Sequence, residues 1–161
     1  MLEIRVAEIR DIPKIIKCHE RNFEPYLSAT QLKSHMGEFP HLAFVLESKT
    51  KEIHGYILGE MRIKKKQEYG VLTSLAVNKR FREKGYGKKL CNSLFNAMIQ
   101  TYKANTVTVY IRLTNELAVQ FYENLDFENE GVEAEYFSDQ TDAYVLKYNL
   151  TNFVITEGVA N

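Results

Sequence analysis

Residues 75–87 read Leu75-Ala76-Val77-Asn78-Lys79-Arg80-Phe81-Arg82-Glu83-Lys84-Gly85-Tyr86-Gly87 and carry the strongest structural signal in the chain. The pattern predicts a buried strand, then a basic loop with two glycines, then an amphipathic helix. The first turn of a helix leaves backbone N–H groups unpaired and carries partial positive charge. Gly85 and Gly87 let an anion approach the backbone closely. Formal positive charge is added by Arg82, Lys84 and Lys88. This arrangement predicts a site for a pyrophosphate group.

Two other phosphate-binding motifs do not fit the same loop. A P-loop requires more glycine and a Gly-Lys-Ser or Gly-Lys-Thr ending, which is missing here. A dinucleotide fingerprint requires a third glycine, but position 90 is Leu90. The remaining alternative is a plain turn whose glycines bind nothing. The core strand before the loop and the helix after it favour anion binding over that alternative.

The composition predicts one folded domain, because the chain has 161 residues, no net formal charge and 45% hydrophobic residues. Nine Phe and ten Tyr are too many for a disordered chain, and zero net charge argues against a nucleic-acid-binding protein. No apolar run is long enough to cross a bilayer, and the N-terminus does not resemble a signal peptide. Two cysteines and four scattered histidines predict neither a disulfide framework nor a metal site. We therefore expect a soluble cytoplasmic protein with one domain over residues 1–150 and a tail over residues 151–161.

Apolar and polar residues are spaced in a way that predicts strands and helices in alternation. Helices are expected to begin near Asp11 and Ser28, whose side chains can cap them, and to cover residues 87–98 and 116–124. Strands are expected over residues 2–7, 42–46, 53–63, 71–77, 106–111 and 142–150. This order, with its hairpins, predicts an α/β class fold in which a mixed sheet carries helices on both faces.

The motif Arg82-Glu83-Lys84-Gly85-Tyr86-Gly87 resembles the acetyl-coenzyme A loop of the GNAT superfamily of N-acetyltransferases, whose pattern is Arg/Gln-x-x-Gly-x-Gly/Ala. The resemblance extends over residues 2–150. It implies the GNAT fold, with a mixed and mostly antiparallel sheet, and acetyl-coenzyme A as the acetyl donor without a metal. It also implies that backbone atoms bind the pantetheine arm at Leu75, Ala76 and Val77. The pyrophosphate would lie at Arg82, Glu83, Lys84, Gly85, Tyr86, Gly87 and Lys88.

A second pair of residues, Asn115 and Tyr122, matches the same family. By resemblance, Asn115 contacts coenzyme A and Tyr122 protonates the leaving thiolate, a suitable role for a phenol of pKa ~10. The oxyanion of the reaction would be met by a strand N–H, at Val77. Two alternatives stay open, namely Asn115 as a helix cap and Tyr122 as a core aromatic residue. The family's usual Gly-Phe after this helix is Asp126-Phe127 here, a departure that affects a turn.

The protonation state of the substrate amine separates two classes of acceptor. An α-amino group with a pKa of ~7.7–8.0 is neutral about one time in ten at neutral pH. A lysine with a pKa of ~10.4 is neutral about once in 2500, a handicap of about 4.6 kcal/mol, so its acetylation needs a strong base. The strand before the coenzyme loop has Tyr69, Val71 and Thr73 as inward candidates, and none is a carboxylate. This favours an N-terminal α-amine over lysine.

Two further segments, residues 72–77 and 135–144, resemble the catalytic subunit of the NatA-type protein N-terminal acetyltransferases. The resemblance implies a peptide clamp formed by the loop between the first two helices and by the closing hairpin. Its substrate-binding residues would be Phe23, Glu24, Tyr26, Tyr136 and Phe137. Glu24 would also be the catalytic base, directly or through water, with Glu60 as the second candidate. The alternatives are a solvated loop carboxylate for Glu24 and a structural aromatic pair in the hairpin for Tyr136 and Phe137. The family has a histidine where Val71 stands, so one proton relay is missing here.

The sequence thus predicts an enzyme that moves acetyl from acetyl-coenzyme A directly to the N-terminal α-amine of proteins or peptides. The alternatives are a lysine or small-amine acetyltransferase and a non-catalytic sensor that binds coenzyme A. Direct transfer needs no acyl-enzyme, so Cys91 is interpreted as a packing residue. The run Lys64-Lys65-Lys66 is interpreted as a solvated hairpin tip, with contact to a ribosome or an auxiliary subunit as the alternative. No nucleic-acid or membrane partner is expected, and the oligomeric state is left open.

Overall fold

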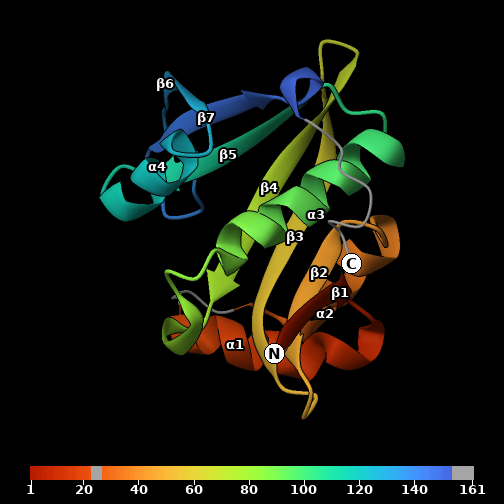
Figure 1. The fold of residues 1–161 in the computed structure, drawn as a ribbon. Helices are drawn as coiled ribbons and strands as arrows, with labels where there is room; N and C mark the ends of the chain where they lie inside the picture. The colour runs from red at the N-terminus through yellow and green to blue at the C-terminus, as the bar shows by residue number, and fades with distance from the viewer. Residues whose placement is uncertain (23–26, 154–161) are drawn as a thin grey trace.

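The computed structural model describes residues 1–22 and 27–153, which contain seven strands, four α-helices and three short 3₁₀ helices (Figure 1). In chain order these are β1 (Leu2–Val6), η1 (Ile9–Asp11), α1 (Ile12–Asn22), α2 (Ala29–Glu38), β2 (Ala43–Ser48), β3 (Ile53–Lys64), β4 (Gln67–Val77), η2 (Lys79–Phe81), α3 (Tyr86–Gln100), β5 (Thr106–Arg112), α4 (Glu116–Glu123), β6 (Glu128–Glu133), β7 (Ala143–Asn149) and η3 (Leu150–Asn152).

The seven strands form one sheet in the order β1-β2-β3-β4-β5-β7-β6. Neighbouring strands are antiparallel except β4 and β5, which are parallel. These two strands pair only over a short stretch, which on β4 runs from Gly70 to Leu72. Beyond Leu72, β4 stays with β3 while β5 continues along β7, so the sheet splits between them (Figure 1). Within the described part of the chain, the second half of β4 therefore has a free edge.

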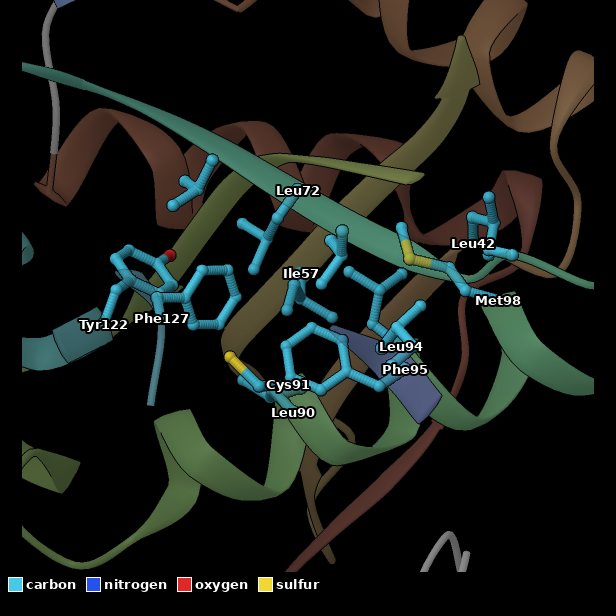
Figure 2. Packing of buried hydrophobic residues seen from close by; sticks show 14 of the residues in the cluster. Leu42, Ile57, Leu72, Leu90, Cys91, Leu94, Phe95, Met98, Tyr122 and Phe127 are labelled. Carbon is cyan, nitrogen blue, oxygen red and sulfur yellow. The ribbon is translucent and has the colours of Figure 1, made fainter. Parts of the chain in front are cut away.

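Each face of the sheet carries its own hydrophobic core. On one face α3 packs across β2, β3 and β4 through a buried cluster that includes Ile57, Leu72 and Leu94 (Figure 2). On the other face α1 and α2 lie over the first four strands, around Ile15 and Tyr56. The side chains of β3 alternate between these two cores, as expected for a strand buried on both faces. The predicted mixed sheet with helices on both faces is confirmed.

The helix starts follow local capping, with one correction. Ser28 caps α2 as predicted, because its Oγ accepts the N–H of Gln31 at 2.9 Å. Asp11 does not cap α1. Its carboxylate accepts two hydrogen bonds from Arg5, at 2.7 and 2.9 Å, and one from the N–H of Glu8 at 2.7 Å. A bidentate salt bridge between arginine and aspartate is stronger than a hydrogen bond from a neutral backbone N–H. Asp11 therefore closes the 3₁₀ turn before the helix and does not cap α1.

Strand β6 is the element that the sequence did not predict. Its six residues, Glu-Asn-Glu-Gly-Val-Glu, are all exposed and show no apolar alternation. It is an edge strand that pairs only with β7, with a register shift between Asn129 and Val132. Backbone pairing alone holds such a strand, so its side chains leave no hydrophobic pattern.

Within the described residues, none of the helices combines the length and apolar character that a membrane span requires.

Candidate active site

The predicted pyrophosphate loop connects β4 to α3 beside the split in the sheet. The chain leaves β4, makes the 3₁₀ turn η2 and enters α3 through Gly85, whose φ of +83° is a left-handed conformation. Glycine adopts this conformation without strain because it has no Cβ. Gly85 also has no side chain that could cap the helix. The first N–H groups of the 15-residue helix α3 are therefore available to an anion.

Gly87 brings the start of α3 close to α4. A Cβ at this position would come within 3.2 Å of the Phe121 ring. The missing side chain therefore lets the two helices approach each other. Tyr122, the next residue of α4, lies near Cys91 of α3 in the same core cluster.

The free edge of β4 offers backbone groups to the split. Asn78 donates its N–H to the carbonyl of His54 on β3, at 2.8 Å. Because these directions alternate along an antiparallel strand, the N–H groups of Leu75 and Val77 point to the opposite edge, where β5 has left. On that edge the carbonyl of Val77 accepts the Nε–H of Arg82 at 2.8 Å. Both N–H groups lie where the sequence predicts the pantetheine arm.

Tyr122 lies at one end of the core cluster under α3, next to Phe127 (Figure 2). Its side chain is only 6% exposed, and the rings of Phe121 and Phe127 contact it edge-on, with centroids 5.0 and 5.3 Å away. Burial, together with the nearby Cys91 thiol, raises the pKa of Tyr122 well above its ordinary value. The phenol is therefore protonated at neutral pH and able to donate a proton. Tyr122 is therefore a core aromatic residue whose phenol also keeps a proton that it can donate.

Asn115 occupies the N-cap of α4, where its Oδ1 accepts the N–H of Ala118 at 3.2 Å. The capping alternative is thus present in the structure, and contact with the coenzyme stays a prediction. The turn after α4 explains the unusual Asp126. Its φ of +70° is the conformation that glycine adopts most readily and that aspartate also tolerates. The N–H of Phe127 still bonds to the carbonyl of Tyr122 at 3.1 Å, so the departure leaves Tyr122 in place.

A cavity of about 700 Å³ opens on the opposite face of the sheet, between α2 and strands β3 and β4. A register shift makes Thr73 an extra residue in β4, and both Thr73 and Ser74 line the cavity. Ser74 Oγ lies 2.8 Å from the hydroxyl of Tyr56, which lies 2.6 Å from His19 Nδ1. The cavity thus reaches β4 directly before the coenzyme-binding stretch. An amine bound here would meet the split from the side opposite α3.

Glu60 of β3 also lines this cavity. Its carboxylate forms an ion pair with Arg62 at 2.7 Å and lies 4.0 Å from Nδ1 of His35. Burial lowers the pKa of His35 against the opposing charge of Glu60, so the imidazole is neutral at neutral pH. The cavity therefore holds a carboxylate without a charged histidine beside it.

The closing hairpin places Tyr136 and Phe137 on the face that carries this cavity. The ring of Tyr136 stacks on Tyr110 of β5, with centroids 4.0 Å apart and an interplanar angle of 8°. Phe137 lies under the guanidinium of Arg112, 4.1 Å from the ring centroid. Arg112 also forms an ion pair with Asp139 at 3.0 Å. The two aromatic residues are therefore fixed to the end of β5.

Phe23, Glu24 and Tyr26, the other half of the predicted peptide clamp, lie outside the described residues, so their roles stay predictions. Cys91 has no exposed surface, and burial raises the pKa of its thiol, which agrees with a packing role. Within residues 1–22 and 27–153, no three His, Cys, Asp or Glu side chains are arranged to hold a metal ion.

A family model described as "Acetyltransferase (GNAT) family" matches residues 7–127. The chain belongs to the GNAT acetyltransferase family. The N-alpha-acetyltransferase daf-31 of Caenorhabditis elegans is 32% identical to it, over 94% of this chain and 85% of the relative. The N-terminal acetyltransferase A complex catalytic subunit NAA10 of Arabidopsis thaliana is also 32% identical, over 93% of this chain and 79% of the relative. A chain from the crystal structure of the NatC complex bound to Gag peptide and CoA has the same fold, with a TM-score of 0.81 at 19% identity, covering 92% of this chain and 98% of that chain.

Arg62 is a further candidate site residue that the sequence did not indicate. It donates to Glu60 and, through Nη1, to the hydroxyl of Tyr136 at 3.0 Å. The spacing Glu-x-Arg in a strand already puts Glu60 and Arg62 on one face. Their connection to Tyr136 and Tyr110 depends on how the hairpin folds over the split, which no local pattern indicates.

Proposed function

We propose that this GNAT acetyltransferase moves the acetyl group of acetyl-coenzyme A directly to the N-terminal α-amine of proteins or peptides. The observation that carries the proposal is the split between β4 and β5. A free strand edge and a helix N-terminus meet the split from one face, and a cavity reaches it from the other. The two N-alpha-acetyltransferases at 32% identity support this class of acceptor.

The residues on the α3 side suit the donor. When bound, acetyl-coenzyme A supplies a thioester at the split. The N–H of Leu75 pairs with the pantetheine arm, and residues 82–88 hold the pyrophosphate through backbone N–H groups and positive charge. The N–H of Val77 donates to the carbonyl oxygen as negative charge develops there. Tyr122, which burial keeps protonated, gives its phenolic proton to the departing sulfur. The attacking nitrogen loses its second proton as the amide forms, and transfer of that proton through water restores the phenol of Tyr122.

The residues on the cavity side serve the acceptor. About nine in ten α-amines carry a proton at neutral pH and have no free lone pair, so a base must remove one proton. Two carboxylates can do this, Glu24 by the family resemblance and Glu60 in the cavity. The peptide clamp of this proposal consists of Phe23, Glu24, Tyr26, Tyr136 and Phe137.

Substrate proteins are the partners that this reaction requires, and we propose an auxiliary subunit as a further one. The Arabidopsis relative is described as the catalytic subunit of a complex, and the NatC structure is also that of a complex. Lys65 and Lys66 form the exposed turn between β3 and β4, a surface suited to an auxiliary subunit or a ribosome. A cytoplasmic location belongs to the same proposal.

The experiment is thiol release from acetyl-coenzyme A with a panel of peptides. The peptides begin with Ser, Ala, Met-Leu or Met-Glu, and each has a control with a blocked N-terminus and an internal lysine. Release with free N-termini alone supports the proposal. Release with the blocked peptides would assign the protein to the lysine class. Coenzyme binding without release from either set would indicate a small-amine enzyme or a sensor.

A further inference from the structure

Glu60 projects from β3 into the cavity between α2 and the diverging strand β4. It shares the cavity with Thr73 and Ser74, the two residues of β4 that directly precede Leu75. Its side chain is 27% exposed, so solvent and substrate can reach it. Among the described residues, the other carboxylate that lines the cavity is Glu38, at the exposed last residue of α2. Glu60 is therefore the carboxylate of this cavity that stands on the strand beside β4.

The two oxygens of Glu60 have different surroundings. Oε2 accepts the Nε–H of Arg62 at 2.7 Å. Oε1 lies 4.0 Å from Nδ1 of His35, which is beyond hydrogen-bonding distance. No residue in the described ranges makes a hydrogen bond to Oε1. One oxygen thus fixes the side chain, and the other is available on the side of His35, another lining residue of the cavity.

The closing hairpin fixes Arg62 in turn. Nη1 of Arg62 donates to the hydroxyl of Tyr136 at 3.0 Å. The guanidinium carbon lies 5.5 Å from the ring centroid of Tyr110 and 5.9 Å from that of Tyr136, and these two rings stack on each other. Hydrogen bonds to a charged donor are stronger than neutral ones, so this contact is well defined. The hairpin that carries the peptide clamp therefore also sets the orientation of Glu60.

We propose that Glu60 is the catalytic base that accepts a proton from the α-ammonium of the substrate, with Arg62 and Tyr136 as positioning residues. The inference rests on the proposed function. One N–H bond of the ammonium breaks, its electron pair stays on nitrogen as the attacking lone pair, and the proton forms an O–H bond with Glu60 Oε1. Water then removes that proton and restores the carboxylate. The negative charge of Glu60 also attracts the incoming ammonium.

The other titratable and charged groups around the cavity are compatible with this role. His35 is neutral, because burial lowers its pKa, so it adds no positive charge that would repel the ammonium. Its Nε2 is buried, so this atom does not reach the acceptor. In the described part of the chain, the groups that face Glu60 or its cavity are Arg62 on β3, His35 and Glu38 on α2, His19 on α1 and Tyr136 in the closing hairpin.

The first test compares kcat/KM from pH 6 to 9.5 for the wild type, Glu60→Gln, Glu24→Gln and the control Glu68→Gln. Glu68 is an exposed carboxylate at the far end of β4. We expect Glu60→Gln to lose about 20-fold near pH 6.5, where about one α-amine in twenty is neutral, with Glu68→Gln unchanged. The loss should shrink toward pH 9.5, because an α-amine of pKa ~7.7–8.0 is then already neutral. A loss that is constant with pH, no loss, or a pH-dependent loss in Glu24→Gln alone would overturn the proposal.

The second test measures binding without the coenzyme. Calorimetry at pH 6.5 compares a substrate peptide that has a free N-terminus with its N-acetylated twin. The wild type should bind the free peptide more tightly, and Glu60→Gln should lose about fivefold of that preference. An unchanged preference would contradict a contact between Glu60 and the ammonium.

A third test concerns the positioning residues. Tyr136→Phe removes the hydroxyl that Arg62 contacts and keeps the ring that stacks on Tyr110. We expect kcat to fall about fivefold with little change in the peptide KM or the melting temperature, and Arg62→Lys to retain more activity than Arg62→Met. Equal losses in both Arg62 variants would reject the positioning role.

The wild-type activity separates failure of the proposed function from failure of this inference. If the wild type acetylates no free N-terminus, the proposed function fails and this inference fails with it. If the wild type and Glu60→Gln are equally active, only this inference fails.

Discussion

The proposed donor and acceptor sides of the split sheet differ in the groups that they offer to a ligand. The α3 side offers backbone groups, at the edge of β4 and at the helix start behind Gly85. The cavity side offers side chains from separate elements, such as Glu60 on β3 and Tyr136 in the closing hairpin. Backbone recognition tolerates changes of side chain but not of conformation, whereas side-chain recognition changes with single substitutions. One fold can therefore keep its donor constant while its acceptor specificity varies.

Tyr122 lies in the core on the α3 side, and its substitution has the largest expected effect. Tyr122→Phe keeps the ring that packs against Phe121 and Phe127 and removes the proton donor. We expect kcat to fall about 100-fold, with both KM values within about twofold of the wild type. Because the pKa of Tyr122 is raised, its ionisation should cause no loss of wild-type activity below about pH 10.

Tyr102→Phe is the matched control, since Tyr102 packs against the same core through Phe39. A loss of kcat smaller than about threefold in Tyr122→Phe would show that another group protonates the sulfur.

The conformation of the donor loop is tested by Gly85→Ala against Gly131→Ala. Both glycines have positive φ, +83° and +118°, and a Cβ at either position would meet no atom within 4 Å. Backbone strain of about 1–2 kcal/mol should therefore lower the melting temperature of both variants. The KM for acetyl-coenzyme A should rise about tenfold in Gly85→Ala alone, since only Gly85 precedes the α3 helix start. Equal KM values in the two variants would separate this loop from coenzyme binding.

The backbone of the proposed donor side, a strand followed by a glycine-containing loop and a helix, is predictable from the sequence almost completely, because each part of it follows local rules. The strand, the glycine spacing and the amphipathic face of α3 are encoded within about two dozen consecutive residues. The proposed acceptor side is predictable only in part. Glu60, Tyr136 and Phe137 are candidates from the sequence, and their roles stay predictions. The hydrogen bond from Arg62 to Tyr136 joins positions 74 residues apart. Such a contact forms only when the hairpin folds over the split in the sheet. No periodicity or local motif in the sequence therefore predicts this contact.

Substitution of Arg112 tests whether the closing hairpin affects peptide binding without affecting coenzyme binding. Its guanidinium covers Phe137 and donates to Asp139 and to the hydroxyl of Thr141 at 2.7 Å. Arg112→Gln should loosen the hairpin and raise the peptide KM about fivefold while leaving the KM for acetyl-coenzyme A unchanged. The ion pair with Asp139 is exposed and therefore weak, so the effect is smaller than those above.

The control for this variant is Arg10→Gln, which removes an exposed arginine paired with Glu8 at the opposite end of the chain. A rise in the coenzyme KM of Arg112→Gln would mean that the two sides of the split are not separable at β5.

Substitutions of Asn115 have the smallest expected effect on the KM values. They distinguish a helix-capping role of this residue from a contact with the coenzyme. Its Oδ1 caps α4, so Asn115→Ala should lower the free energy of unfolding by about 1 kcal/mol. Asn115→Ser restores a capping oxygen and should recover most of that stability. A serine hydroxyl is shorter than the amide, so if Asn115 also contacts the coenzyme, both variants should raise the KM for acetyl-coenzyme A about threefold. A wild-type KM in Asn115→Ser would show that capping is the whole role of this residue, and that the donor side relies on backbone groups here as well.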